Sequence, residues 1–150
     1  MAADKNSRQA VCSNRRALRD YFITDSVEAG LSLLGPEAKS LRLKQVKIEH
    51  AFARILNGQA VLFNAHIAPY AFNTAVKAEP MRERRLLLKK KEIKRLAAFS
   101  AVKGNALVPL EIYFIRGWAK IKLGLCKGKQ APDKRETIKK RDIERQLRRI

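Results

Sequence analysis

The stretch RERRLLLKKKEIKR, residues 82–95, combines dense positive charge with three consecutive leucines. It contains eight basic residues and two acidic ones. Beyond the leucines, apolar residues recur at the three- and four-residue steps of one helix face, at Ile93, Leu96, Ala97 and Ala101. The pattern predicts a helix with one face docked and the other positive. Gly104 is the predicted C-cap, since glycine takes the left-handed conformation without steric cost.

The composition points to one basic domain that binds a polyanion. A chain of 150 residues that is 46% hydrophobic can bury one core but not two. Its 33 Lys and Arg against 14 Asp and Glu give a net charge of +19. Such a charge repels itself in a compact domain, so nucleic acid is the natural partner. No apolar run approaches the ~20 residues of a membrane span, and the start MAADKNSRQA is too polar for a signal peptide, so we expect a cytoplasmic protein without a membrane partner.

Residues that could support catalysis or metal binding are sparse. Cys12, Cys126, His50 and His66 are too few and too scattered for a zinc site. The sequence contains no glycine-rich phosphate loop, no paired histidines and no Ser-Gly elbow. We therefore expect no metal, no cofactor and no enzymatic activity.

The N-terminal third is expected to hold an arm, two strands and a short helix. Residues 1–13 are polar and without period, which predicts a flexible arm. The β-branched and aromatic run at 20–24 favours a strand, and alternation over 29–33 predicts a second one. Pro36 then opens a short helix that runs to about Arg42.

Two hairpins are predicted in the rest of the domain. Asn57-Gly58 divides residues 51–67, and Arg116-Gly117 divides 107–126, each at a tight turn. In the first hairpin one face is assigned to Val61, Phe63, Ala65 and Ile67, and the other to Leu62, Asn64 and His66. Trp118, beside the second turn, is expected to pack within the sheet rather than to stack on a base.

These elements predict a mainly β fold with short α-helices. About six strands and several tight turns favour a closed, six-stranded β-barrel of the oligonucleotide-binding (OB) kind, because an open sheet would expose its edges. The barrel is assigned to residues 14–129. Residues 130–150 form a basic tail that cannot bury enough surface to fold alone, although Ile143, Leu147 and Ile150 have the spacing to form a helix against a partner.

Seven segments, in order from Asn14 nearly to the C-terminus, are similar to one family, the SsrA-binding proteins or small protein B. They are NRRALRDYFI, EAGLSLLGPEAKSLR, NGQAVLFNAHIAPY, PMRERRLLLKKKEI, KGNALVPLEIYF, AKIKLGLCKGK and DKRETIKKRD. The resemblance implies an OB-type barrel with flanking helices and a tail that is disordered in the free protein and helical on the ribosome. It also implies trans-translation, in which the protein brings transfer-messenger RNA (tmRNA) to a stalled ribosome, so that the nascent peptide is tagged for proteolysis.

The resemblance also implies partners and the roles of some of the predicted site residues: RNA binding for Glu28, Leu87 and Lys89, and action on the ribosome for Lys127, Lys129, Asp133, Lys134 and Arg135. The partners are the tRNA-like domain of tmRNA and ribosomal RNA at the decoding centre and message channel, with elongation factor Tu and alanyl-tRNA synthetase reached indirectly through the RNA. We expect the protein to act as a monomer. The predicted RNA-binding residues are Asn14, Arg15, Glu28, Lys39, Arg42, Asn64, His66, Arg82, Arg84, Arg85, Leu87, Lys89, Lys120 and Lys122. The residues assigned to the decoding site are Lys127, Lys129, Asp133, Lys134, Arg135, Lys139, Lys140 and Arg141.

At three positions the chain departs from the family pattern. Lys44 stands where a glycine is usual, Lys89 where His or Asn is common, and Pro132 where an aromatic residue or His generally precedes Asp133. A proline in place of a ring weakens any stacking contact in the decoding centre. Two other readings also account for the charge: a constitutive ribosomal or assembly protein, and a nonspecific nucleic-acid binder.

Overall fold

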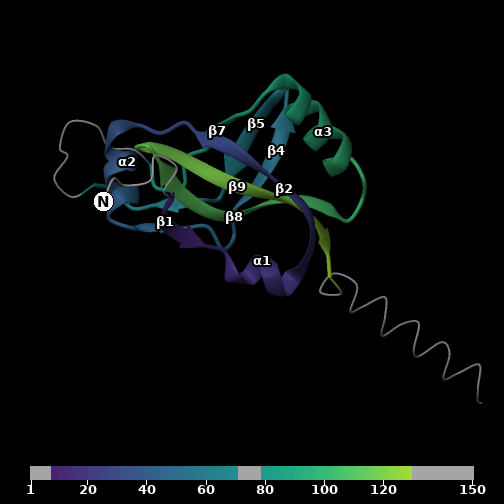
Figure 1. Ribbon diagram of the computed structural model, residues 1–150, viewed down its shortest axis with the longest axis horizontal. Helices are drawn as coiled ribbons and strands as arrows, with labels where there is room; N and C mark the ends of the chain where they lie inside the picture. The colour runs from purple at the N-terminus through teal and green to yellow at the C-terminus, as the bar shows by residue number, and fades with distance from the viewer. Residues whose placement is uncertain (1–7, 71–78, 130–150) are drawn as a thin grey trace, which may run out of the picture.

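A computed structural model describes residues 8–70 and 79–129 of the chain, and these residues form a mainly β structure with three short helices (Figure 1). The elements are β1 (Arg8–Ser13), α1 (Arg15–Asp20), β2 (Tyr21–Leu31), α2 (Gly35–Arg42), β3 (Val46–Lys47), β4 (Phe52–Leu56), β5 (Gln59–Phe63), β6 (His66–Ile67), β7 (Arg84–Leu87), α3 (Lys90–Ser100), β8 (Asn105–Ile115) and β9 (Trp118–Gly128). The prediction of a mainly β chain with short helices is confirmed. No helix in the described ranges is long and apolar enough to cross a bilayer.

The main sheet closes on itself. Its strand order is β1-β8-β4-β5-β7-β2-β9, and β9 pairs again with β8, so six strands form a ring with β1 attached outside on β8. The ring is joined between β4 and β8 by a single residue pair, Ala53 with Leu107. The interior is filled by the apolar side chains of these strands, including Ala29, Leu62 and Ile121.

Both predicted hairpins are confirmed. Asn57 and Gly58 have φ values of 51° and 74°, and Arg116 and Gly117 have 52° and 81°. Two consecutive residues with positive φ are the requirement of a type I′ turn, whose twist matches that of the strands it joins. The second hairpin pairs the 11-residue strands β8 and β9 along their whole length.

The N-terminal third differs from the prediction in three ways. Residues 8–13, assigned to a flexible arm, form β1 and pair with β8, while residues 1–7 lie outside the described part. Residues 15–20 form the unpredicted helix α1, capped by Asn14, whose side chain accepts a hydrogen bond from Ala17 N–H at 3.1 Å. The two short strands expected at 20–24 and 29–33 are one continuous strand, β2.

The segment 82–95 is only partly helical, so the opening prediction was wrong in its first half. Arg84 and Leu86 are buried, whereas Arg85 and Leu87 are exposed, which is the two-residue period of strand β7. The helix begins at Lys90 and ends at Ser100, with Ala101 as its C-cap. Gly104 has a φ of 89° but lies in the following loop.

The face assigned to the first hairpin was also wrong. Ala60 and Leu62 point into the core, and then Asn64 takes a φ of 61°. This left-handed residue breaks the alternation, so that Ala65 and Ile67 also point inward. Periodicity did not reveal the break, although asparagine is one of the few non-glycine residues that adopt this conformation readily.

A buried ion-pair cluster ties α2 to β7. Arg84 is fully buried, and its guanidinium donates to Glu37 Oε2 at 2.8 Å, to Ala65 O at 2.6 Å and to Pro80 O at 3.0 Å. Arg82 donates to Glu37 Oε1 at 2.6 Å, and Leu34 N–H donates to the same oxygen at 2.9 Å. Burial by itself would raise the pKa of Glu37, but the bonds from Arg82, Leu34 and Arg84 hold it below its ordinary value.

Lys44, which departs from the family's usual glycine, has a φ of 60°. A left-handed conformation strains any residue with a Cβ atom, and glycine avoids that strain. The structure therefore explains why glycine suits this position after α2.

Glu37→Gln should destabilise the fold by about 3–5 kcal/mol, because it leaves the buried Arg84 guanidinium without its counter-charge. A carboxylate with a depressed pKa stabilises the fold above its unfolded pKa, about 4.3, and that contribution is lost as the pH falls through the folded pKa. The gap between wild type and variant in urea unfolding should therefore narrow at acid pH.

Asp20→Asn is the matched control, since Asp20 pairs with Arg16 at 3.0 Å on the surface. It should cost no more than about 1 kcal/mol. A loss of similar size in both variants, or a gap for Glu37→Gln that stays constant with pH, would contradict the assigned role of the buried pair.

Candidate nucleic-acid interface

Four neighbouring strands, β7, β2, β9 and β8, present one continuous outer face (Figure 1). Leu87 pairs with Gly30, Gly30 with Lys120, and Lys120 with Tyr113, so these residues form one row across the sheet. A Cβ atom added at Gly30 would lie 3.1 Å from Leu87 Cβ, which shows how closely Leu87 lies across the glycine. Directly paired residues point to the same side of a sheet, so the row lies on its outer surface.

A second row runs parallel to the first. Glu28 pairs with Lys122, and Lys122 with Glu111, while the alternating residues Ala29 and Ile121 point into the core. We call this surface the four-strand face. Its members are Arg85, Leu87, Glu28, Lys120, Lys122, Glu111 and Tyr113. The structure thus brings together five of the predicted RNA-binding residues, which come from three separate parts of the sequence.

Glu28 is held in place by a buried tyrosine. The hydroxyl of Tyr113 donates to Glu28 Oε2 at 2.6 Å, and Tyr113 is only 3% exposed. Burial first, and the hydrogen bond to Glu28 second, raise the pKa of Tyr113, so the phenol remains a donor. The guanidinium of Arg8 lies 3.8 Å from the centre of the tyrosine ring and also pairs with Glu111. Glu28 is therefore an exposed carboxylate whose position is fixed by a hydrogen bond from a buried residue.

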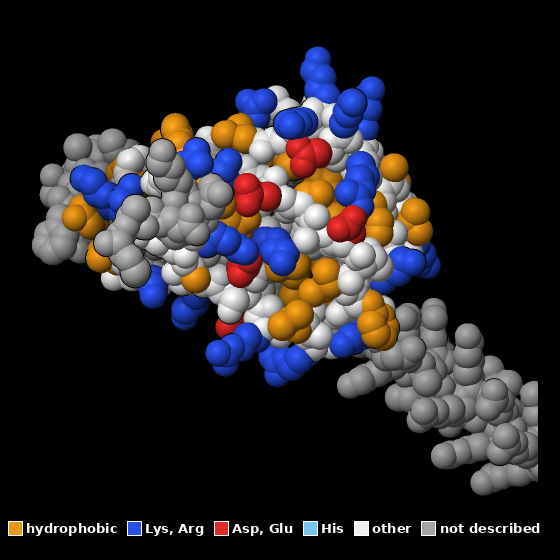
Figure 2. All heavy atoms as spheres, in the orientation of Figure 1, with side chains coloured by type: hydrophobic (Ala, Val, Ile, Leu, Met, Phe, Trp, Pro, Cys, Tyr) orange, Lys and Arg blue, Asp and Glu red, His pale blue; other side chains and the backbone are white. Residues whose placement is uncertain are grey.

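Basic side chains surround this face. Figure 2 shows Lys and Arg gathered over α3, and the exposed ones there include Lys89, Lys90, Lys91 and Lys94. Arg95 pairs with Asp25 of β2, and hydrogen bonding from Arg95 lowers the pKa of that carboxyl. On the other side of β2, a groove of about 390 Å³ is lined by Arg15, Leu18, Asp25, Lys122 and their neighbours. Arg15 therefore belongs to the same surface as Lys122.

A second group of predicted residues lies at the α2 end of the molecule. Lys39 and Arg42 are on α2, which contacts β6, where His66 lies; Asn64 is in the turn before it. Lys39 Nζ lies 5.3 Å from the centre of the Tyr70 ring, and the Arg42 guanidinium 5.2 Å from that of Phe114. Phe114 is near the end of β8, so this group adjoins the end of the four-strand face.

Two predicted RNA-binding residues are structural. Asn14 is 2% exposed, and its amide donates to Pro109 O at 2.9 Å and to Ile48 O at 3.2 Å besides capping α1. Arg84 is fully buried with Glu37, so its predicted contact with RNA is wrong. The partly buried Arg82 also gives its Nη2 to Glu37. An asparagine directly before a basic helix is a common N-cap, and that signal could have identified Asn14.

The tail leaves the fold beside α1. Lys129 N–H donates to Asp20 O at 2.8 Å, and its Nζ donates to Leu18 O at 3.1 Å and lies 5.0 Å from the centre of the Phe22 ring. Lys127 is exposed at the end of β9. The other predicted tail residues lie outside the described residues: Pro132, Asp133, Lys134, Arg135, Lys139, Lys140 and Arg141.

One aromatic side chain does not follow the prediction of packing. Trp118, at the start of β9, is 71% exposed. The expectation that it packs within the sheet was therefore wrong.

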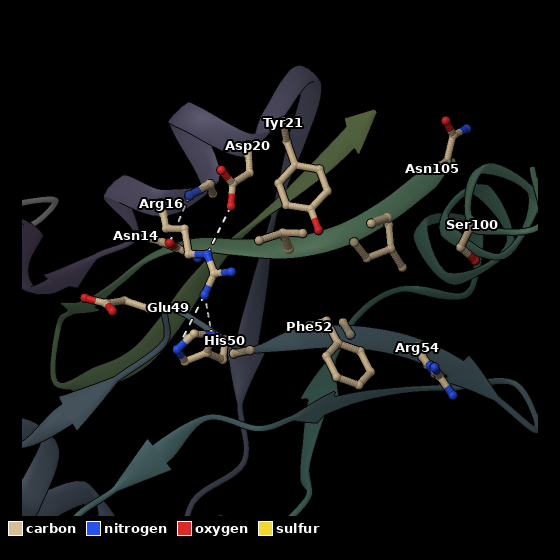
Figure 3. A pocket seen from close by; sticks show the side chains of 16 residues that line it. Asn14, Arg16, Asp20, Tyr21, Glu49, His50, Phe52, Arg54, Ser100 and Asn105 are labelled. Atoms are coloured by element: carbon tan, nitrogen blue, oxygen red, sulfur yellow. Dashed lines mark hydrogen bonds and ion pairs between the residues drawn. The ribbon is translucent and has the colours of Figure 1, made fainter. Parts of the chain in front are cut away.

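The larger hollow lies on another side of the fold, between α1, β4 and β8 (Figure 3). Its volume is about 530 Å³, and Arg16 stands between Asp20 and His50 at one end of it. Phe52 stacks on Phe63 at 5.4 Å and has the Arg54 guanidinium 5.1 Å from its ring centre. Because the ring already has partners on its faces and the charges are mixed, this hollow is a poor base-binding site.

The described residues contain no group of three or more His, Cys, Asp or Glu side chains that could hold a metal. Burial raises the pKa of both Cys12 and Cys126 to about 11, so neither thiol is activated as a nucleophile.

Comparison with known proteins identifies the family of the chain. The family model described as "SmpB protein" matches residues 11–150. The SsrA-binding protein of Elusimicrobium minutum is 52% identical over 147 residues, 98% of this chain and 94% of that protein. The SsrA-binding protein of Caldicellulosiruptor saccharolyticus is 46% identical over 149 residues, 97% of this chain and 94% of that protein.

A solved structure is also similar to the chain. Its description reads "tmRNA-SmpB: a journey to the center of the bacterial ribosome". The similarity has a TM-score of 0.68 at 47% identity and covers 80% of this chain and 85% of that one. With a family match over residues 11–150 and relatives of this identity along nearly the whole length, the chain belongs to the SmpB family of SsrA-binding proteins.

Proposed function

We propose that this protein binds the tRNA-like domain of tmRNA and carries it to stalled ribosomes for trans-translation. The single observation that carries the proposal is the four-strand face, because it gathers Glu28, Leu87, Lys120 and Lys122 beside a basic helix. The relatives are named for binding SsrA, and the solved neighbour is tmRNA-SmpB in the bacterial ribosome. A constitutive ribosomal protein would have the charge but not this family relationship.

Two kinds of contact would hold the RNA. Lys120, Lys122, Arg85 and the lysines of α3 neutralise phosphates, which positions the protein without reading sequence. Glu28 accepts hydrogen bonds from base or ribose donors in the unstacked loops of the RNA, where such donors are accessible. An acidic side chain facing a polyanion is unfavourable unless it makes such bonds, so Glu28 supplies specificity rather than bulk attraction.

The barrel and the tail would have separate roles, tmRNA binding and action on the ribosome. We infer that the ring of six strands is an OB-type barrel, since its closure and its exposed strand face agree with that architecture. The barrel, residues 14–129 with β1 added, holds tmRNA, and residues 130–150 act on the ribosome. There they contact ribosomal RNA at the decoding centre and message channel in place of the anticodon arm that tmRNA lacks.

No catalysis is part of this function. The protein acts as a monomeric binding module in the cytoplasm, and it meets elongation factor Tu and alanyl-tRNA synthetase only through the bound RNA. Lys39, Arg42, Asn64 and His66 at the α2 end would extend the RNA contact beyond the four-strand face. Lys89, at the start of α3, would add a phosphate contact beside Leu87.

Glu28→Gln tests the specific contact. The change keeps the size of the side chain and one acceptor oxygen but removes the charge. Binding of the tRNA-like domain should weaken by about 1.5–3 kcal/mol, the value of a charge-assisted hydrogen bond, although the protein becomes more positive. Filter binding at matched salt, together with thermal melts, measures the effect.

Tyr113→Phe is the matched control, because it removes the donor to Glu28 but leaves the carboxylate and every charge in place. It should weaken binding less than Glu28→Gln. Unchanged or tighter binding by Glu28→Gln at equal thermal stability would remove Glu28 from the site, and a loss explained by a lower melting temperature would make its role structural.

Truncation after Lys129 tests whether the tail is needed on the ribosome but not for binding tmRNA. It leaves every described helix and strand whole, including β9, which ends at Gly128, and the hydrogen bond from Lys129 N–H to Asp20. Binding of the tRNA-like domain should remain nearly intact, while tagging of peptides on stalled ribosomes in a reconstituted translation system should be abolished. Equal loss of both activities would contradict the division between barrel and tail.

A further inference from the structure

Trp118 is the only tryptophan in the chain, and it occupies an unusual position for so large an apolar side chain. It is the first residue of β9, directly after the Arg116-Gly117 turn, and it pairs with Ile115 across the hairpin. At 71% exposure it is the most exposed of the large hydrophobic side chains in the described ranges. The turn geometry itself is set by Arg116 and Gly117, so the hairpin does not require a tryptophan next to them.

The tip of this hairpin continues the four-strand face. Trp118 lies two residues before Lys120, so it points to the same side of β9, about 7 Å further along the strand. Lys120 in turn lies beside Gly30 and Tyr113 in the first row of the face. An exposed aromatic ring therefore ends the line that runs from Lys122 through Lys120.

The same tip also adjoins the α2 group. Arg42 lies over the ring of Phe114, and Phe114 pairs with Ala119, the residue after Trp118. Phe114 and Ala119 point to the inner side of the sheet, so this charge lies near the hairpin tip but not on the face that carries Trp118. An exposed ring in line with Lys120 and Lys122 has the composition of a single-stranded nucleic-acid site, in which bases stack on aromatic side chains while basic residues neutralise the phosphates.

We propose that Trp118 is a stacking platform for one unpaired nucleobase of the bound RNA, at the end of the four-strand face. This inference rests on the proposed function, because the base would belong to a loop of the tRNA-like domain. Every base has a π-face, so the contact tolerates different bases and contributes affinity rather than sequence selection. It is thus separate in kind from the hydrogen bonds assigned to Glu28.

Intrinsic fluorescence reports on this contact directly, because the chain has no other tryptophan. Titration of the full-length protein with the tRNA-like domain should quench the emission of Trp118 and protect it from acrylamide. Filter binding of labelled RNA, run in parallel, shows independently whether the complex has formed. A second titration with small ribosomal subunits distinguishes a base of tmRNA from a base of ribosomal RNA, and quenching by subunits alone would overturn the assignment to tmRNA.

Substitution supplies the second readout. Trp118→Leu keeps an apolar side chain but removes the ring, and it should weaken binding of the tRNA-like domain by about 5- to 150-fold, the range that loss of one base–aromatic stack produces. Trp118→Phe should retain most of the affinity. The matched control is Leu56→Ala at the tip of the other type I′ hairpin, where Leu56 is 46% exposed, and it should have no effect.

The outcomes separate this inference from the proposed function. RNA that binds without change in Trp118 fluorescence or quencher access, with Trp118→Leu binding as tightly as wild type, would overturn the stacking platform and leave the function standing. Failure of the wild-type protein to bind the tRNA-like domain at all would overturn both.

Discussion

The ion pair between Glu37 and Arg84 is the constraint on which the rest of the structure depends. Arg84 is fully buried and its guanidinium reaches Glu37 of α2 and two backbone carbonyls, at Ala65 and Pro80, so three segments far apart in sequence meet at one charge. A buried cation is tolerated only when every donor has a partner. Because Arg84 is in β7, this pair fixes the strand that carries Leu87 and Arg85 on the outer face.

The parts of the fold that follow from local chemistry could be predicted from the sequence. Asn57-Gly58 and Arg116-Gly117 fix their turns by themselves, and Pro36 opens α2 as expected. The failures come from tertiary context. Arg84 lies inward because it pairs with the buried carboxylate of Glu37, and Leu86 lies inward among the apolar core residues. A sequence rich in lysine, leucine and arginine otherwise favours a helix.

In the candidate site, too, the residues could be predicted from the sequence, but their arrangement and burial depend on tertiary structure. Glu28, Leu87, Lys120 and Lys122 were predicted separately, and strand pairing brings them to one face. Asn14 and Arg84 were predicted to contact RNA, but their burial reveals structural roles. Trp118 was expected to pack because most aromatic residues in strands do; its exposure is set by its place at a hairpin tip, which periodicity alone does not indicate.

The most direct test of the central claim, that the four-strand face binds the RNA, is lysine acetylation footprinting of the full-length protein with and without the tRNA-like domain. Mass spectrometry resolves each lysine in one experiment. Lys120 and Lys122 should become protected, while Lys103, which is exposed in the loop between α3 and β8, should react as before. Protection of Lys103 with Lys120 and Lys122 unchanged would contradict the account.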